Sequence, residues 1–139
     1  ENEDFGYEQT EHDPALRYTF RTAPLRNLKV APACFHNGAF GTLEAAIAHH
    51  LDVESSLRNY DAVANKVPSD LSPGPFEGIL AARIDPLLQT PLRLTKKEFR
   101  DLVEFVRDGL FDRQILRFCK HIPESVPSGL SLQRFEGCD

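Results

Sequence analysis

The pattern of apolar and polar positions predicts an amphipathic helix over residues 42–50. Its expected buried face repeats every three or four positions and consists of Leu43, Ala46, Ile47 and His50. Thr42 is placed to cap this helix, and Glu44 puts negative charge at its positive N-terminal end. His49 lies about 100° around the helix from His50, so we expect His49 to be the more exposed of the two histidines.

The strongest helical pattern covers residues 95–108. Thr95 and Glu98 have the spacing of a capping box, in which each side chain binds the backbone N–H of the other residue. The expected buried stripe consists of Phe99, Leu102, Val103 and Val106. Gly109 is a natural C-terminal stop. A further short helix is expected over residues 111–118.

Proline, glycine and polar residues divide the rest of the chain. Residues 1–16 are expected to be mostly irregular, and residues 52–75 to form a long loop. Residues 76–88 are expected to contain a short helix interrupted near Pro86. The dipeptide Asn37-Gly38 predicts a tight turn before the first amphipathic helix. The pattern therefore predicts a mainly α fold with long irregular loops.

Composition agrees with a single globular domain over residues 1–139. The chain is 41% hydrophobic and 27% charged, which is ordinary for such a domain. A net charge of −5 makes nucleic acid an unsuitable partner. No apolar run approaches the length of a membrane span. The motifs of serine hydrolases, zinc proteases and phosphate-binding loops are also missing, which argues against those enzyme classes.

Two groups of residues could carry chemistry. His36 lies in the predicted turn, whereas His49 and His50 lie at the end of the predicted helix, so the three imidazoles could face one site. The alternative, that they are solvated histidines at a turn and a helix end, remains open. Arg21 and Arg26 belong to the most basic part of the chain, which is either a solvated loop or a surface that meets anionic groups.

The three cysteines do not form a haem-attachment motif. Cys34, Cys119 and Cys138 are too far apart for the arrangement Cys-x-x-Cys-His, and Cys119-Lys120-His121 has the wrong spacing. In an oxidising compartment Cys119 could pair with Cys138, or all three could remain separate thiols.

Three consecutive segments resemble a known family. They are Phe20–Asn27 (FRTAPLRN), Ala31–Gly38 (APACFHNG) and Thr42–Glu44 (TLE). In order and spacing they are similar to the C-terminal haem domain of bacterial di-haem cytochrome c peroxidases and their MauG-like relatives. The resemblance covers residues 17–60 and returns at residues 94–106.

The resemblance implies a cytochrome c-like helical domain that forms the C-terminal part of a periplasmic, peroxidase-like oxidoreductase. It implies haem c as cofactor, attached covalently outside this chain, and it assigns no catalytic residue here. The implied partners are the remainder of the di-haem protein, or a second chain carrying Cys-x-x-Cys-His, and a small electron-donor protein. The alternative is a haemless module that docks a separate redox protein.

The resemblance also implies roles for four residues. In the family, an axial ligand of the haem iron lies fourteen positions beyond the turn histidine, and counting from His36 reaches His50. This ligand is Met or Tyr in the family, whereas the chain contains no Met. Ligation by His50 would imply a lower reduction potential than ligation by Met. His36 would lie near the haem edge, unless it is simply a turn histidine bonded to backbone, and Arg21 and Arg26 would face the haem propionates.

Overall fold

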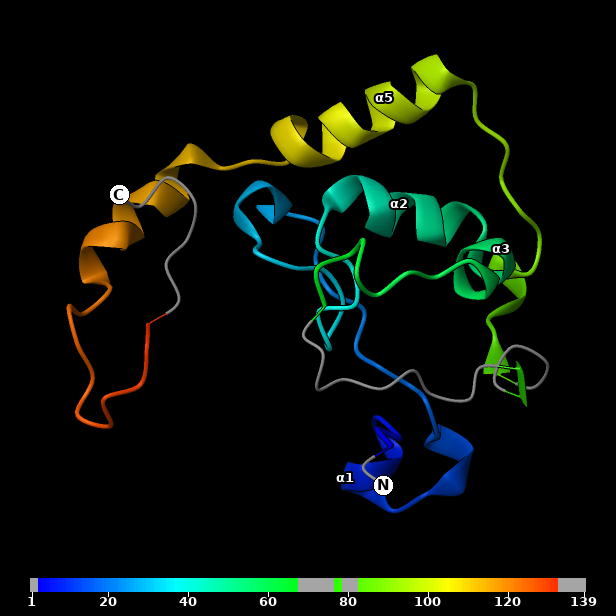
Figure 1. Ribbon diagram of the computed structural model, residues 1–139, viewed down its shortest axis with the longest axis horizontal. Helices are drawn as coiled ribbons and strands as arrows, with labels where there is room; N and C mark the ends of the chain where they lie inside the picture. The colour runs from blue at the N-terminus through cyan, green and yellow to red at the C-terminus, as the bar shows by residue number, and fades with distance from the viewer. Residues whose placement is uncertain (1–2, 68–76, 79–82, 133–139) are drawn as a thin grey trace.

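The computed structural model of the chain describes residues 3–67, 77–78 and 83–132 (Figure 1). Helices account for 46% of the structure, and no β-strand occurs within the described ranges. Pairing of β type is limited there to two isolated bridges, Gly6 with Thr19 and Cys34 with Phe40. The expectation of a mainly helical chain with irregular connections is therefore confirmed.

Helix α2 (Leu43–Leu51) forms where the apolar pattern predicts it. The Thr42 side-chain oxygen accepts a hydrogen bond from the N–H of Ala45 at 3.2 Å, which satisfies one of the free donors of the first turn. Glu44 lies in that turn, as expected, and favours it electrostatically.

A second helix, α3 (Val53–Arg58), follows α2 directly and corrects the expectation of a loop beginning at residue 52. Asp52 ends α2 and at the same time caps α3, because its carboxylate accepts a hydrogen bond from the N–H of Ser55 at 3.1 Å. The chain therefore turns sharply after α2, and α3 contacts the C-terminal end of that helix.

Helix α5 (Lys96–Glu104) begins with the expected capping box. The Thr95 side chain accepts from the N–H of Glu98 at 3.2 Å, and the Glu98 carboxylate accepts from the N–H of Thr95 at 2.8 Å. The helix continues into a single π-helical turn, η4 (Phe105–Gly109), so the helical path ends at the glycine that the sequence indicates.

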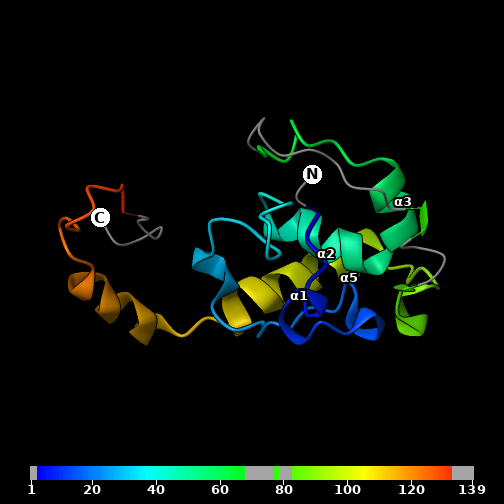
Figure 2. The same cartoon turned by 90° about the horizontal axis from the view of Figure 1, so that it is seen from below.

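The core lies where α5 runs alongside α2, as Figure 1 and Figure 2 both show. Five side chains are buried in the described part of the chain: Phe40, Ala46, Val53, Val103 and Val106. Two of these come from the predicted stripe of α5 and its π-helical turn, and Ala46 comes from the middle of α2. Apart from Phe40, the buried side chains are small, so the core between α2 and α5 is narrow and requires close contact between the two helices.

Hydrogen bonds centred on Asn27 connect the segment that carries Arg21 and Arg26, which we call the basic run, to the segment that follows α5. The N–H of Asn27 donates to the carbonyl of Leu110 at 3.2 Å, and the Asn27 side-chain oxygen accepts from the N–H of Asp112 at 2.8 Å. Asn27 has a φ of 66°, a left-handed conformation that asparagine tolerates better than most residues. We refer to these two hydrogen bonds as the Asn27 clasp.

Two ion pairs flank the Asn27 clasp. Arg26 Nη2 lies 3.1 Å from a carboxylate oxygen of Asp112, and Lys29 Nζ lies 2.7 Å from one of Asp108. All four side chains are substantially exposed, so solvent screens both pairs and their contribution to folding is small. The hydrogen bonds of the clasp therefore determine the geometry of this contact, and the ion pairs support it.

The N-terminal segment contains two short helices, α1 (Glu8–Glu11) and η1 (Pro14–Leu16), where irregular structure is expected from the sequence. They lie below α2 in Figure 1. Arg17 binds both carboxylate oxygens of Glu8, with its Nη2 donating at 2.9 Å. This bidentate pair folds the segment back on itself.

The remaining described elements are single turns or 3₁₀ helices: η2 (Leu28–Val30), η3 (Pro86–Leu88) and η5 (Arg113–His121). The helix expected over residues 111–118 is thus of 3₁₀ type and begins two residues later. Much of the region 76–88, where a short helix is expected, lies outside the described residues. In both views η5 stands away from α2 and α5 (Figure 1, Figure 2). None of the helices in the described ranges has the length and apolar character to cross a membrane.

The capping box gives a direct test of the fold around α5. Replacing Thr95 by Ala removes the side-chain acceptor for the N–H of Glu98, and we expect the free energy of unfolding to fall by about 1 kcal/mol. Urea denaturation followed by circular dichroism measures this change. Thr90→Ala, at an exposed position outside any helix, is the matched control and should change the free energy by less than about 0.5 kcal/mol. Equal effects of the two substitutions would contradict a role of the cap.

Candidate functional site

The turn before α2 and the C-terminal end of α2 bring four aromatic rings together. They are Phe35, Phe40, His49 and His50, and we call them the histidine–phenylalanine cluster. The ring centroids of Phe35 and Phe40 are 5.2 Å apart, and Phe35 also lies 5.3 Å from each histidine ring. The cluster contains two of the three histidines that the sequence singles out.

The turn is closed by backbone hydrogen bonds on both sides of Asn37. The N–H of Cys34 donates to the carbonyl of Phe40 at 2.8 Å, and the N–H of Gly38 donates to the carbonyl of Phe35 at 3.2 Å. Gly38 has a φ of 69°, which a glycine adopts without strain. The predicted Asn-Gly turn is therefore confirmed, and it presents Phe35 to the end of α2.

His50 is exposed, but its ring is held in place. Its Nδ1 lies 2.9 Å from the backbone carbonyl of Ala46, and since a carbonyl only accepts, Nδ1 carries the proton. A neutral His50 therefore keeps its lone pair on Nε2. The Phe35 ring lies nearly parallel to the imidazole, with an interplanar angle of 16°.

His49 occupies a different environment although it is the neighbouring residue. Its ring is half-buried between the edge of Phe35 and the tilted ring of Phe40, whose centroid is 5.1 Å away. Its Nδ1 is hydrogen-bonded to the hydroxyl of Ser56 on α3, at 3.0 Å. Burial of the ring and, to a smaller extent, the adjacent His50 together lower the pKa of His49 from 6.5 to about 4.

The expected order of exposure of the two histidines is therefore wrong: His50 is exposed, and His49 is the more buried ring. The physical reason is the position of α3. Because α3 packs at the C-terminal end of α2, Ser56 is hydrogen-bonded to His49, and Phe40, whose ring also meets Tyr60, lies against the His49 ring. The apolar pattern of α2 alone does not specify which flank of the helix its neighbour covers.

His36 lies in the same turn but contacts other groups. Its Nε2 is 3.2 Å from a carboxylate oxygen of Asp4, and its ring stacks on Phe20 with centroids 4.0 Å apart and an interplanar angle of 15°. Both contacts are with side chains, so His36 does not match the alternative expectation of a turn histidine hydrogen-bonded to backbone. The structure thus connects His36 to the N-terminal segment and to the basic run, and it separates His36 from the ring contacts of the cluster.

The two predicted propionate-binding arginines lie on the surface. Arg26 pairs with Asp112 and keeps 69% of its side chain exposed. Arg21 is also exposed and has no ion-pair partner within the described ranges. Their assignment to haem propionates stays a prediction.

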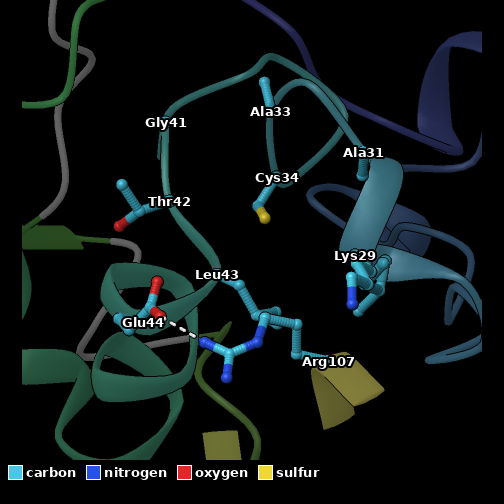
Figure 3. A pocket seen from close by; sticks show the side chains of 10 residues that line it. Lys29, Ala31, Ala33, Cys34, Gly41, Thr42, Leu43, Glu44 and Arg107 are labelled. Carbon is cyan, nitrogen blue, oxygen red and sulfur yellow. Dashed lines mark hydrogen bonds and ion pairs between the residues drawn. The ribbon is translucent and has the colours of Figure 1, made fainter. Parts of the chain in front are cut away.

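A hollow of about 210 Å³ lies on the other side of the turn, between η2 and the start of α2 (Figure 3). Cys34 lines it together with Lys29, Thr42 and Arg107, and Arg107 points toward Glu44 at 3.5 Å. Burial and the negative charge of Glu44 raise the pKa of the Cys34 thiol, which makes this free cysteine a poor nucleophile. The possible pair Cys119–Cys138 involves a position outside the described residues, namely Cys138.

The described residues contain no group of three or more His, Cys, Asp or Glu side chains arranged to hold a metal ion. Comparisons with protein-family models, with characterised proteins and with solved structures found no match.

Sequence reasoning identified both histidines of the cluster but missed the residues that surround them. The sequence pattern places Ser56 in a loop, whereas Ser56 lies in α3 and is hydrogen-bonded there to His49. The sequence signal for α3 is Asp52, a residue suited to cap a helix. Phe35 and Phe40 flank the predicted turn, and the tight closure of that turn is the signal that they would meet the end of α2.

The low pKa of His49 predicts a pH dependence of stability. Since the pKa is about 4 in the folded chain and near 6.5 when unfolded, the unfolded chain binds more protons between these values. The burial of neutral His49 therefore costs no stability above about pH 6.5, and the free energy of unfolding falls as the pH is lowered from there toward 4. A shift of this size corresponds to about 3 kcal/mol, and partial exposure of the ring reduces the expected loss to about 1–2 kcal/mol.

His49→Gln should remove this part of the pH dependence, which urea denaturation at several pH values between 4 and 7 measures. Carboxylates titrate in the same range, so the relevant quantity is the difference between the variant and the unmodified chain. His121→Gln, at an exposed position, is the control and should leave the profile unchanged. A His49→Gln profile that matches the unmodified chain would contradict the assigned cause.

Proposed function

We propose that this chain is the distal half of a c-type haem domain in a di-haem cytochrome c peroxidase-like protein of the periplasm. In this proposal His50 supplies one axial ligand of a haem iron. The haem is attached to Cys-x-x-Cys-His on the remainder of the protein or on a second chain, and it would supply reversible one-electron transfer toward a peroxide-reducing haem elsewhere. A small redox protein would be the electron donor.

The single observation that carries the proposal is the state of the His50 imidazole. A histidine that binds a metal through Nε2 commonly donates its other N–H to a backbone carbonyl, which fixes the tautomer and the ring orientation. His50 has this arrangement, with Nδ1 donating to Ala46 and an exposed ring. The motif register of the resemblance leads to the same residue.

His49 is the less suitable ligand of the pair. Its ring is enclosed by Phe35, Phe40 and Ser56, so a macrocycle could approach it only after these contacts had been broken. The same contacts hold His49 neutral near pH 7, because its pKa is lowered to about 4. His49 therefore adds no positive charge beside His50 under those conditions.

Exposed aromatic rings and exposed guanidinium groups on this part of the chain suit a haem in two respects. Phe35 and Phe20 expose 41% and 42% of their surface, and both stack on histidines, Phe35 on His50 and Phe20 on His36. Exposed flat rings of this kind offer apolar contact to a macrocycle. Next to Phe20, the exposed guanidinium of Arg21 is available to a propionate, and Arg26 follows in the same run.

The second candidate function is a haemless module that docks a separate redox protein. One observation favours it: several large apolar side chains on the described residues are strongly exposed, including Val63 at 86% and Leu87 at 88%. Such side chains are suited to contact with another chain. Soret absorbance of the native assembly separates the two candidates, together with a search for a co-purifying polypeptide that carries Cys-x-x-Cys-His.

Ligation can be tested with a ferric haem peptide that carries one proximal histidine and an open sixth position. Titrating this peptide with the chain at pH 7 should convert its high-spin spectrum to a six-coordinate low-spin one. We expect His50→Ala to weaken this conversion by at least about tenfold and His49→Ala to leave it nearly unchanged. Lowering the pH should reverse binding, because a proton competes with iron for the same lone pair.

Each outcome of the titration decides between assignments. If His49→Ala abolishes the low-spin spectrum and His50→Ala does not, the register is wrong by one residue. If neither substitution changes it, neither histidine of the pair is the ligand, and the haemless candidate replaces the proposal. His121→Ala controls for nonspecific ligation by exposed histidines.

A further inference from the structure

Phe35 combines two features that are unusual for a phenylalanine. Its backbone has a φ of 68°, in the left-handed region that residues other than glycine seldom occupy. Its side chain is 41% exposed, so it does not belong to the buried core. A bulky residue in a strained backbone conformation, with a ring that fills no interior space, indicates a role beyond packing.

The surrounding structure holds Phe35 in this conformation from several sides. The carbonyl of Phe35 accepts from Gly38, and the neighbouring Cys34 is bonded to Phe40 across the turn. On the side-chain side, Phe40 lies at a tilt of 48° and His49 meets the ring edge-on at 90°. The ring plane is therefore determined by groups other than His50.

His50, in contrast, has few restraints of its own. The hydrogen bond from Nδ1 to Ala46 fixes one edge of the imidazole, but it permits rotation of the ring plane about the direction of that bond. Two rings contact the imidazole: Phe35 lies nearly parallel to it with centroids 5.3 Å apart, and His49 meets it edge-on at 5.8 Å and 88°. The hydrogen bond sets the direction of Nε2, and Phe35 is the ring that lies along the plane of the imidazole.

We propose that Phe35 is a positioning residue that sets the plane of the His50 imidazole. The strained turn holds the Phe35 ring, and the ring holds the imidazole. The part of this proposal that concerns haem rests on the proposed function, because the plane of an axial imidazole affects the electronic structure of the bound iron. The part that concerns orientation holds for the chain alone.

The orientation is tested on the full chain without any added cofactor. Nuclear magnetic resonance of the His50 ring protons in Phe35→Leu should show the loss of the ring-current shift and a reduced population of the tautomer protonated on Nδ1. Phe35→Tyr keeps an aromatic ring at the same place and should retain both signals. Phe20→Leu, which removes the equivalent stack from His36, is the matched control and should leave His50 unchanged.

Circular dichroism of each variant shows whether the fold survives. If Phe35→Leu unfolds the chain, the comparison moves to Phe35→His, which keeps a smaller flat ring and should give intermediate shifts. His50 signals that are the same in folded Phe35→Leu, or folded Phe35→His, as in the unmodified chain would overturn the proposal.

A second measurement connects orientation to ligation. With the ferric haem peptide as probe, Phe35→Leu should change the anisotropy of the low-spin electron paramagnetic resonance signal and weaken binding several-fold, and Phe35→Tyr should restore both. If the unmodified chain does not bind the haem peptide, the proposed function fails, while the resonance experiment on the free chain still decides the role of Phe35. If binding occurs and the signal is the same in Phe35→Leu, Phe35 does not position the ligand.

Discussion

The arrangement of this chain depends on the Asn27 clasp, because it joins two segments that are 85 residues apart in the sequence. The clasp fixes the basic run to the residues that follow η4, the π-helical turn that continues α5, and α5 in turn lies against α2. The core between these helices consists of a few small side chains, so it tolerates little change in the distance between them. Polar groups at Asn27 thus determine where the apolar surfaces meet.

The same constraint connects the fold to the histidine–phenylalanine cluster. The turn that presents Phe35 lies between the Asn27 clasp and α2, and both ends of this segment are anchored. Its internal hydrogen bonds then leave little freedom to the rings it carries. The site is therefore built on a short loop, but that loop is held by helices on either side.

Much of the helical structure could be predicted from the sequence, because its signals are local. The capping box at Thr95 and the cap at Thr42 involve residues three positions apart, and both form as expected. The exposure of His49 and His50 could not be predicted in the same way, since it depends on a contact between α2 and α3. Asp52 ends α2 and caps the start of α3, and the pattern of apolar positions does not predict this change from one helix to the next. The sequence pattern identifies His50 as a candidate site residue, but it does not identify the tertiary contacts that fix the orientation of its ring.

The turn at Phe35 also restricts how this sequence can change over evolutionary time. Glycine, asparagine and aspartate adopt a positive φ easily, but none of them carries a ring that could stack on His50, and histidine, which is also enriched there, carries only a smaller ring. A substitution that relaxes the backbone therefore removes or shrinks the stacked ring, and one that keeps a full-sized aromatic ring keeps the strain. The backbone strain at this position cannot be lowered without weakening the ring contact. Relatives that keep a histidine at position 50 should therefore keep an aromatic residue at position 35.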